Sequence, residues 1–328
     1  MKHLAVIIPF YQKKSGLLLN AVNSIFKQNN IDGLKITIII VDDESPIKPD
    51  KELLNIEPVI HIDIQTIHQK NAGPAKARNV GLDLADALNV DFIAFLDSDD
   101  IWHSDHIHRA LLCLGGISEF YFCDHQRFDD EKSYFNVEVD ISEFIKKRKL
   151  NNSLFITIDS ELFFSHLIEN YACQTSTIVF SHKILNGLRF DESLTVAGED
   201  YLMWLHLVSK SSYVTMDLKS GVDYGEGVNI FKSSNNWGNP LSVKNNFDQY
   251  QLYLKIKAEF ALNDFAGGIV IRKMKEKLKI FSYLSFKFAF KLNFLGFKLL
   301  FNSDLPKFET LFKMSTNFFK YIISRMLK

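Results

Sequence analysis

Short apolar runs alternate with segments of helical periodicity through the first third of the chain. Runs rich in Ile, Val and Phe predict buried strands, and apolar residues spaced three and four apart predict amphipathic helices. The expected strands cover residues 4–8 (ended by Pro9), 34–41, 59–67 and 92–96, and the expected helices cover 15–28 and about 75–88. This alternation with short loops is typical of α/β proteins with a mostly parallel, doubly wound sheet.

The pattern is less regular farther along the chain. Residues 117–124 and 175–180 predict two more strands, and residues 201–209 predict a helix with Trp204 on its apolar face. Residues 125–170 are mixed and charged, and they give no clear assignment. The sequence therefore predicts an α/β body.

Acidic residues stand directly behind two of the expected strands. Asp42 and Asp43 follow the second strand, and Asp97, Asp99 and Asp100 follow the fourth. Open α/β sheets bind ligands beyond the carboxyl ends of their strands. Massed carboxylates there favour a cation, and hard divalent ions bind through one or two carboxylates plus substrate phosphates. The pattern indicates a metal and nucleotide-diphosphate site, and the alternative is an acidic loop that caps the next helix.

A second carboxylate pair, Glu199 and Asp200, stands just before the expected helix over 201–209. Acids stabilise the N-terminal end of a helix through its dipole, which would be a purely structural role. A single acid at the mouth of a pocket is equally a candidate general base. Position alone leaves both interpretations open.

Composition narrows the class of protein. The chain has 328 residues, of which 47% are apolar and 23% charged, as in globular rather than disordered proteins. Its three cysteines are widely spaced and form no Cys-x-x-Cys pair, which argues against a disulfide framework or a zinc site and fits a reducing compartment. The apolar N-terminal run has no small-residue cleavage site, so we interpret it as a first strand rather than a signal peptide.

Six motifs together resemble bacterial glycosyltransferase family 2. Each is common alone, but their order and spacing over about residues 3–210 are specific. They are residues 6–11 (VIIPFY), 24–28 (SIFKQ), 41–45 (VDDES), 71–81 (NAGPAKARNVG), 95–100 (FLDSDD) and 198–200 (GED) with Trp204. The resemblance implies the GT-A fold, an α/β architecture with a Rossmann-like, mostly parallel central sheet flanked by helices and a helical C-terminal extension.

The resemblance also implies a domain division. The catalytic domain would cover residues 1–229, with a nucleotide-sugar half at about 1–115 and an acceptor half at about 116–229. Residues 230–328 would form a loop and a basic, Phe-rich helical region.

Roles for single residues follow from the resemblance. Asp42 would hydrogen-bond the nucleobase of the donor, and Asp99 would hold Mn2+ or Mg2+. Asp200 would be the catalytic base, supported by Glu199. The donor nucleotide would be bound by Pro9, Tyr11, Asp42, Asp43, Asn71, Gly73, Arg78, Asp97 and Ser98, and the candidate acceptor contacts are Thr175, His206 and Trp237.

Two positions depart from the family pattern. Members usually have Gly in the slot of Glu44, so an added acid stands near the donor pocket. The helix after Asp200 often carries Arg where this chain has His206, which bears on how the diphosphate or acceptor is held.

The implied reaction is inverting, metal-dependent transfer of a sugar from a nucleotide sugar, with UDP-sugars as the expected donors. The acceptor would be a hydroxyl of a surface glycan such as lipopolysaccharide or capsule, free or lipid-linked, and no nucleic acid partner is expected. One alternative is a nucleotidyltransferase, which would normally show a Gly/Arg-rich phosphate loop where this chain has residues 9–12. The other is a non-catalytic sugar-nucleotide-binding or membrane scaffold protein, which would not require Asp200.

The C-terminal region is basic and rich in phenylalanine. Residues 270–328 hold thirteen Lys and Arg against three Asp and Glu. Residues 280–301 are long enough to span a bilayer, but Lys287 and Lys291 near the middle cost about as much as the apolar residues gain. As one continuous helix, this segment would place five phenylalanines on one face beside a strip of lysines, namely Phe286, Phe290, Phe294, Phe297 and Phe301.

That pattern indicates peripheral contact of residues 270–328 with an anionic membrane. The expected localisation is cytoplasmic, peripheral on the cytoplasmic face of the inner membrane. The alternative is an ordinary helical subdomain or an oligomer interface.

Overall fold

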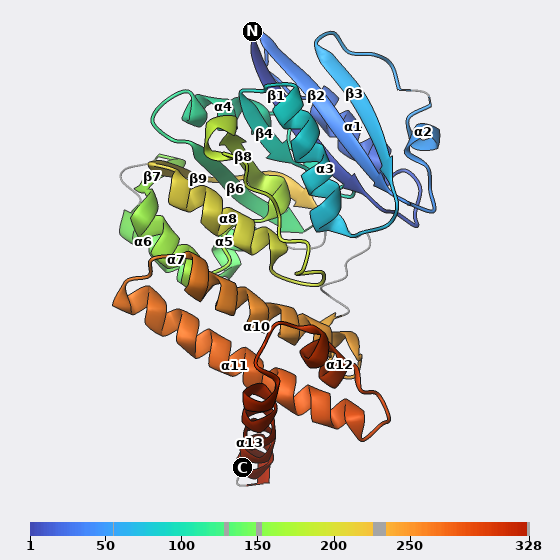
Figure 1. Ribbon diagram of the computed structural model, residues 1–328. Helices are drawn as coiled ribbons and strands as arrows, with labels where there is room; N and C mark the ends of the chain where they lie inside the picture. Colours follow the sequence, from blue (N-terminus) through green and yellow to red (C-terminus); the bar gives the residue numbers. More distant parts are fainter. Residues whose placement is uncertain (55, 128–130, 149–152, 226–233, 327–328) are drawn as a thin grey trace. The chain divides into compact units, whose positions relative to one another are not determined.

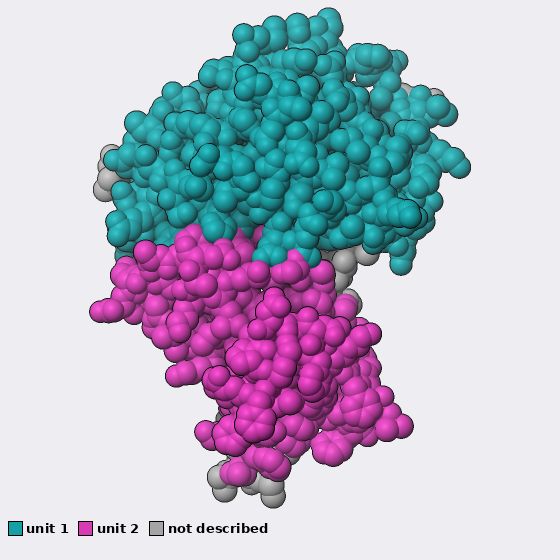
Figure 2. All heavy atoms as spheres, in the orientation of Figure 1, with its two compact units in different colours: residues 1–192, 203–228 teal, residues 193–202, 229–328 magenta. Residues whose placement is uncertain are grey.

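The computed structural model describes residues 1–54, 56–127, 131–148, 153–225 and 234–326 (Figure 1). The chain forms two compact units, residues 1–192 with 203–228 and residues 193–202 with 229–328, which Figure 2 shows in two colours. The expected domain boundary at residue 229 falls among residues 226–233, which lie outside the described residues.

The first unit contains a nine-stranded sheet in the order β3-β2-β1-β4-β8-β6-β9-β5, with β7 also paired to β9. The strands β3, β2, β1 and β4 are parallel, whereas β8 is antiparallel to both β4 and β6. The strands are β1 Lys2–Phe10, β2 Leu34–Asp43, β3 Ile62–Gln69, β4 Phe92–Phe95, β5 Ile101–Trp102, β6 Phe120–Arg127, β7 Phe155–Asp159, β8 Ile178–Ser181 and β9 Tyr213–Tyr224. The predicted central sheet flanked by helices is thus confirmed. The sheet is mixed, because β6 is also parallel to β9 whereas β5 and β7 are antiparallel to β9.

The helices of this unit flank both faces of the sheet (Figure 1). They are α1 Leu17–Phe26, α2 Pro49–Glu52, α3 Pro74–Ala87, α4 His106–Leu114, α5 Tyr134–Val137, α6 Val139–Arg148, α7 Ser160–Glu169 and most of α8 Glu199–Lys210, with short 3-10 turns at Thr175–Thr177 and His182–Ile184.

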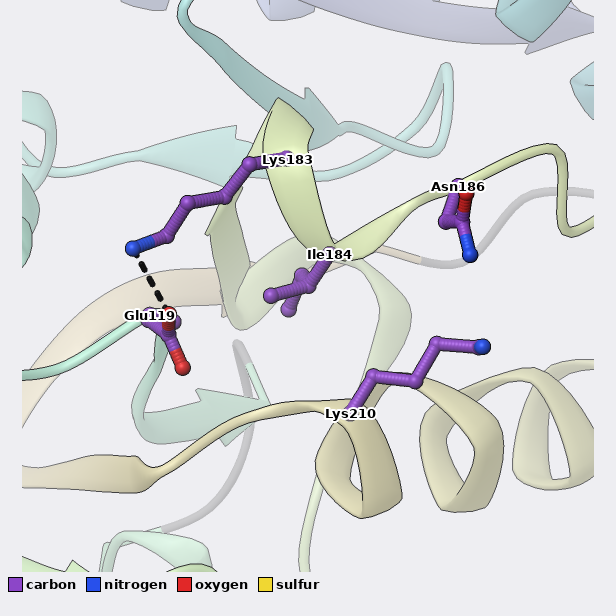
Figure 3. Close-up of a pocket in the computed structure, with 5 residues that line it drawn as sticks. All are labelled: Glu119, Lys183, Ile184, Asn186 and Lys210. Atoms are coloured by element: carbon purple, nitrogen blue, oxygen red, sulfur yellow. Dashed lines mark ion pairs between the residues drawn. The ribbon is translucent and has the colours of Figure 1, made fainter.

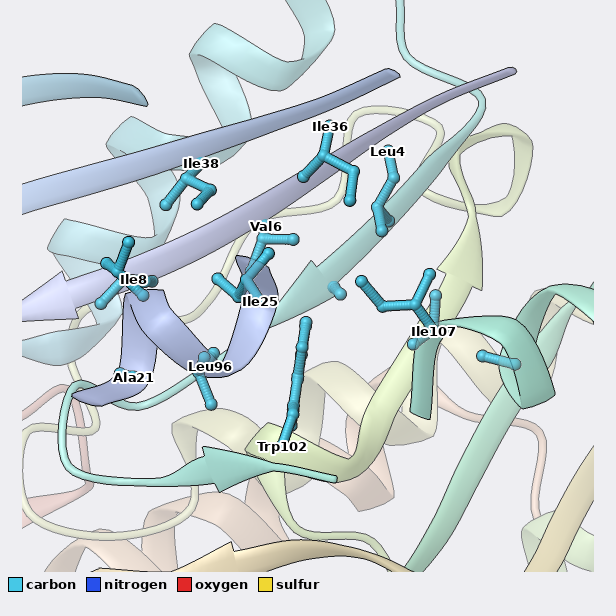
Figure 4. Close-up of a cluster of buried hydrophobic side chains, with 14 of the residues drawn as sticks. Leu4, Val6, Ile8, Ala21, Ile25, Ile36, Ile38, Leu96, Trp102 and Ile107 are labelled. Atoms are coloured by element: carbon cyan, nitrogen blue, oxygen red, sulfur yellow. The ribbon is translucent and has the colours of Figure 1, made fainter. Parts of the chain in front are cut away.

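Alternating side chains of β1 supply the core on both faces. Val6 and Ile8 pack with Ile25 of α1 in one apolar cluster (Figure 4). Ile7 points to the opposite face, where Gly81 of α3 lies so close that an added Cβ would stand 2.4 Å from the Ile7 side chain. Residues i and i+2 of a strand share a face, so α1 and α3 cover opposite faces of the same strand.

The prediction that Pro9 ends the first strand was wrong, because β1 continues to Phe10. The last pair between β1 and β4 is Ile7 with Phe95, and Leu96 N donates to Ile7 O on that side. Residues 7 and 9 direct their backbone polar groups toward the same neighbouring strand, which is β4. Because β4 has already ended at the level of Pro9, an N–H at this position would have had no partner in the sheet. Proline is tolerated where its N–H has no ladder partner.

Two further elements differ from the predictions. Thr175–Thr177 form a 3-10 turn, so the expected strand over 175–180 starts only at Ile178. The helix expected over 201–209 begins at Glu199, which makes Glu199 and Asp200 its first turn rather than residues before it.

In the part of the second unit that the structure describes, four long segments of helix, α10 to α13, surround an apolar core of their own. They are α10 Leu241–Glu259, α11 Asp264–Ala289, α12 Leu295–Asn302 and α13 Lys307–Met326. Phe247 of α10, Phe281 of α11, Leu300 of α12 and Met314 of α13 all lie in that core. None of the described helices has the length and apolar character needed to cross a bilayer.

The prediction of one continuous helix over 280–301 was wrong. Helix α11 ends at Ala289, and the chain reverses at residues 290–294 before α12 begins. Gly296 then lies against α11, where an added Cβ would stand 2.0 Å from Ser285 Oγ. Since only glycine permits this approach, the two helices fold back on each other and the expected stripe of five phenylalanines is divided between them.

Candidate active site

The acidic loop, residues 97–100 after β4, is anchored by its last carboxylate. Asp100 is 1% exposed and accepts hydrogen bonds from Ser176 Oγ at 2.5 Å and Gly225 N at 2.8 Å. Ser176 Oγ also accepts from Asp97 N at 2.9 Å. Asp100 is therefore a structural residue that ties the loop to the 3-10 turn and to the end of β9.

Asp97 is held from the other side by Arg78 of α3. Arg78 Nη2 lies 3.0 Å from Asp97 Oδ1, and the guanidinium is 5.5 Å from the Phe190 ring centroid. The Arg78 side chain is 6% exposed, whereas that of Asp97 is 30% exposed. This half-buried ion pair fixes one edge of the acidic loop and leaves Asp97 partly accessible.

The acidic loop has the donor chemistry of a divalent cation site. Burial raises the pKa of the Asp100 carboxyl well above its usual value, and the carboxylates of Asp97 and Asp99 raise it further. A cation would offset this crowding of negative charge. No three His, Cys, Asp or Glu side chains of the described residues converge as a preformed cage. The oxygen donors present therefore fit a Mg2+- or Mn2+-type ion that takes one or two carboxylates and completes its shell with phosphate oxygens.

Asp42, at the end of β2, is buried and surrounded by donors. Its Oδ1 accepts from Ser45 N at 2.7 Å, and its Oδ2 lies 3.0 Å from His68 Nδ1 and 3.4 Å from Lys48 Nζ. The side chain is 1% exposed. A ligand that reaches this carboxylate must therefore displace Lys48 or His68, whose side chains are about half exposed.

Asp43 organises the loop that leads into α3. Its carboxylate accepts from Gln69 Nε2 at 2.7 Å, Ala72 N at 2.8 Å and Gly73 N at 2.9 Å. Asn71 Nδ2 donates to Asp43 O at 3.0 Å. Asn71 and Gly73, which were predicted to contact the donor, are thus hydrogen-bonded to Asp43. Their loop lies at the carboxyl edge of the sheet.

Glu44, where the family resemblance predicts glycine, adopts a left-handed backbone with φ of 59°. Its Oε2 accepts from Asn71 N at 3.2 Å. A positive φ is strained for a residue with a side chain, so this position retains the backbone shape that suits glycine.

The predicted donor residues all belong to the first unit. They lie at the carboxyl ends of β1, β2 and β4 and at the start of α3, where parallel strands end together. Pro9 and Tyr11 are half-buried beside the end of β2, and Ser98 is buried and accepts from Gln12 Nε2 at 3.0 Å.

The second carboxylate pair opens α8, and Asp200 and Glu199 are both half-buried. Tyr201 N donates to Asp200 Oδ1 at 2.7 Å. Gly198, with φ of 99°, precedes them in a conformation that favours glycine, and an added Cβ would stand 2.9 Å from Leu252 of α10.

Asp248 of α10 holds the loop before this pair. Its Oδ2 accepts from Thr195 N at 3.1 Å and Val196 N at 2.9 Å, and its Oδ1 pairs with Lys244. Burial raises the pKa of the Asp248 carboxyl, against the lowering effect of Lys244 and the two amides. Asp248 is therefore an internal support for the segment that carries Asp200.

The three candidate acceptor residues lie in different elements. Thr175 is buried in the 3-10 turn, where its neighbour Ser176 makes the contacts to the acidic loop. His206 is half-buried in α8. Trp237 belongs to the second unit, where its ring lies 6.0 Å from Tyr283 and its carbonyl accepts from Lys287.

Sequence reasoning missed Asp100, Ser176, Gln12 and Asp248 as supports of the site. One signal for Asp100 was present, because Ile101 and Trp102 directly after it are apolar and return the chain to the sheet. No sequence signal pointed to Asp248, which lies about fifty positions from the loop that it supports.

A separate depression of about 330 Å³ lies at the opposite end of the strands, beyond β8 (Figure 3). It is lined by Glu119, Lys183, Ile184, Asn186 and Lys210, and Lys183 pairs with Glu119 at 2.7 Å. None of the predicted site residues lines it.

Gly225→Ala is expected to lower the melting temperature of the chain by several degrees. The added Cβ would stand 1.9 Å from Asp99 O, so the end of β9 or the acidic loop must shift. Overpacking of this kind typically costs about 1–3 kcal/mol, and about 1 kcal/mol corresponds to roughly 2–4 °C in a domain of about 150–250 residues. Gly116→Ala is the matched control, since its Cβ would meet only Cys113 O at 3.5 Å. If Gly225→Ala and Gly116→Ala melted at the same temperature, the close packing of Gly225 against the Asp99 backbone would be contradicted.

Comparison with known proteins places these features in a family. The profile of the family described as Glycosyl transferase family 2 matches residues 5–168. The succinoglycan biosynthesis protein ExoW of Rhizobium meliloti is 33% identical over 252 residues, which are 76% of this chain and 77% of that protein. The UDP-Glc:alpha-D-GlcNAc-diphosphoundecaprenol beta-1,3-glucosyltransferase WfgD of Escherichia coli is 22% identical over 211 residues, or 64% of this chain and 71% of that protein.

Solved structures resemble this fold at low sequence identity. S. aureus TarS 1-349 in complex with UDP-GlcNAc has a TM-score of 0.57 and 18% identity, covering 88% of this chain and 73% of that one. The mannosyltransferase PcManGT from Pyrobaculum calidifontis, in complex with GDP-Man and Mn2+, has a TM-score of 0.54 and 12% identity. The match covers 95% of this chain and 79% of that one.

These similarities confirm the predicted family and fold, and they favour a glycosyltransferase over the nucleotidyltransferase and the non-catalytic scaffold. The family profile matches half of the chain, and ExoW is similar over three quarters of it. The chain therefore belongs to glycosyltransferase family 2 and is a glycosyltransferase with the GT-A fold.

Proposed function

We propose that this glycosyltransferase catalyses inverting, metal-dependent transfer of a sugar from a UDP-sugar to a hydroxyl of a surface-glycan acceptor. The observation that carries the proposal is the acidic loop at the carboxyl end of β4, where Asp97, Asp99 and Asp100 crowd together and Arg78 is paired with Asp97. Carboxylates beside a buried guanidinium at this edge suit a nucleoside diphosphate and its cation.

The donor side uses residues of β1, β2 and the acidic loop. Asp42 would accept a hydrogen bond from the nucleobase, with Pro9 and Tyr11 beside the base and ribose. Asp99 would hold Mn2+ or Mg2+, which when bound neutralises charge on the leaving diphosphate. Arg78 keeps Asp97 in place through their 3.0 Å contact, so that the loop is already shaped before the donor binds.

The acceptor side uses the first turn of α8. Asp200 would remove the proton of the attacking hydroxyl, and Glu199 would support it or the acceptor. Tyr201 N donates to Asp200 Oδ1 at 2.7 Å, which orients the carboxylate at the start of α8. One displacement opposite the leaving group inverts the anomeric centre, so no covalent nucleophile is required.

Relatives support the acceptor class. ExoW is named for succinoglycan biosynthesis, and WfgD is named as a glucosyltransferase that acts on a diphosphoundecaprenol-linked sugar. TarS was solved with UDP-GlcNAc and with UDP. We therefore propose a polysaccharide or lipid-linked glycan acceptor and a UDP-sugar donor for this chain.

The basic C-terminal region supports a peripheral membrane location. Residues 270–328 carry thirteen Lys and Arg against three acids, and basic residues near an anionic leaflet are attracted to it. The proposal places the enzyme on the cytoplasmic face of the inner membrane, where lipid-linked acceptors would be reached.

A thermal-shift screen of nucleotide sugars, with and without Mn2+ or Mg2+, tests the proposal. A UDP-sugar at about 100 times its Kd should stabilise the chain by about 2.7 kcal/mol, and only with metal present. Any donor that stabilises should then be hydrolysed slowly to UDP and free sugar, measured by UDP release. Stabilisation by no nucleotide sugar under any metal condition would refute the proposed donor.

A further inference from the structure

Large apolar side chains are exposed along the last three helices. Eight of them fall within residues 290–323, at Phe290, Leu292, Phe294, Phe301, Phe308, Phe312, Phe319 and Ile323. Exposed apolar patches of this extent mark interaction sites in water-soluble domains.

The turn between α11 and α12 presents three of these side chains together. Leu292 has a φ of 60° and its side chain is 84% exposed, with Phe290 and Phe294 exposed on either side. A left-handed backbone is strained for leucine, and such strain typically persists at functional sites. The described residues of the second unit leave Leu292 uncovered, so its apolar side chain is available to an external partner.

Helix α13 continues the same surface. At about 100° per residue, Phe308, Phe312, Phe319 and Ile323 fall within an arc of about 60°. The buried Phe318 of α13 lies beside the turn, because its ring is 6.2 Å from that of Phe290. The turn and the stripe are therefore on neighbouring elements.

Charge identifies the occupant of this surface. Lys291, Lys298, Lys313 and Lys320 are exposed around it. The acids in residues 286–323 are Asp304 and Glu309, and Glu309 is paired with Lys313. A symmetric contact with a second copy would bring these lysines toward one another, which is unfavourable. An anionic lipid surface offers both an apolar layer and negative charge.

We propose that residues 290–294 and the exposed stripe of α13 form a membrane-docking surface that inserts into the headgroup region of a bilayer containing anionic lipid. The inference rests on the proposed peripheral location and deepens it by naming the inserted side chains. Phenylalanine and leucine would enter the interface while the surrounding lysines contact lipid phosphates.

The test is flotation of the full-length protein with vesicles of phosphatidylglycerol and phosphatidylethanolamine, compared with vesicles of phosphatidylcholine alone. The protein should bind the anionic vesicles, and binding should fall with added salt. Leu292→Gly should weaken binding about tenfold, since an apolar side chain of this size contributes about 1.5–3 kcal/mol on full burial. Glycine accepts the positive φ at this position, so the variant is expected to fold at least as well.

Two more variants complete the experiment. Phe308→Gln with Phe312→Gln should also weaken binding, while glutamine keeps the helix propensity of α13. Ile60→Ser, which removes a side chain that is 83% exposed in the first unit, is the matched control and should bind as the unchanged protein does.

Three results would overturn the inference. These are failure of the full-length protein to bind anionic vesicles, equal binding by Leu292→Gly and Ile60→Ser, or a dimer in light scattering that Leu292→Gly dissociates. Donor binding is measured without lipid, so loss of the proposed sugar-transfer function and loss of the docking surface are distinguishable.

Discussion

Asp200→Asn should reduce sugar transfer by about 10²–10⁴-fold while leaving donor binding unchanged, because a positioned general base contributes that range of acceleration. Asparagine keeps the Oδ1 acceptor for Tyr201 N, so the first turn of α8 should remain formed. The amide nitrogen that replaces Oδ2 cannot take up the acceptor proton. The measurement is the rate of glycan product formation beside the thermal shift with the donor.

Asp50→Asn is the matched control, since Asp50 is an exposed acid in the first turn of α2. It should leave the transfer rate unchanged. An Asp200→Asn variant that transfers sugar at the normal rate would show that another group is the base. Glu199→Gln would then be the next variant to measure.

Asp99→Ala should abolish the part of donor stabilisation that depends on metal. Asp99 is half-buried in the middle of the acidic loop, which Asp97 anchors to Arg78 and Asp100 anchors to Ser176 and Gly225. At about 100 times its Kd a ligand adds about 2.7 kcal/mol, so several degrees of metal-dependent shift should disappear. The readout is melting temperature with donor, with and without Mn2+.

Asp100→Ala separates ligand binding from support of the loop. It removes the acceptor of two buried hydrogen bonds, and each donor left unsatisfied costs about 1–3 kcal/mol. Its melting temperature should therefore fall without any ligand. Full metal-dependent stabilisation of Asp99→Ala by the donor would rule out Asp99 as the metal ligand.

The sequence predicted the elements whose signals are local. Strands β1, β2 and β4 and helix α3 were found within a few residues, because continuous burial and periodicity report directly on the covered faces. The end of β1 was misplaced because the tolerance for Pro9 depends on where a neighbouring strand stops. The break in α11 was missed because it depends on Gly296 lying against Ser285, a contact between helices.

The residue types of the candidate site could be predicted from the sequence, but the contacts of each residue could not. Acids behind strand ends were expected to lie at one edge of the sheet, and the structure places Asp42 and Asp97 at the carboxyl ends of β2 and β4. The sequence could not show that Asp100 faces inward, since that depends on Ser176 and Gly225 from distant parts of the chain. Nor could it show that Asp43 holds the loop of Ala72 and Gly73.

The contacts of α10 have a consequence for protein engineering. Asp248 holds the backbone at Thr195 and Val196, and Leu252 lies against Gly198. A chimera that exchanges C-terminal helices between related transferases should therefore be joined after Glu259. A junction before Leu241 would combine the Asp200 segment with α10 of another protein. The contacts between α10 and residues 195–198 would then be lost unless both segments came from the same parent.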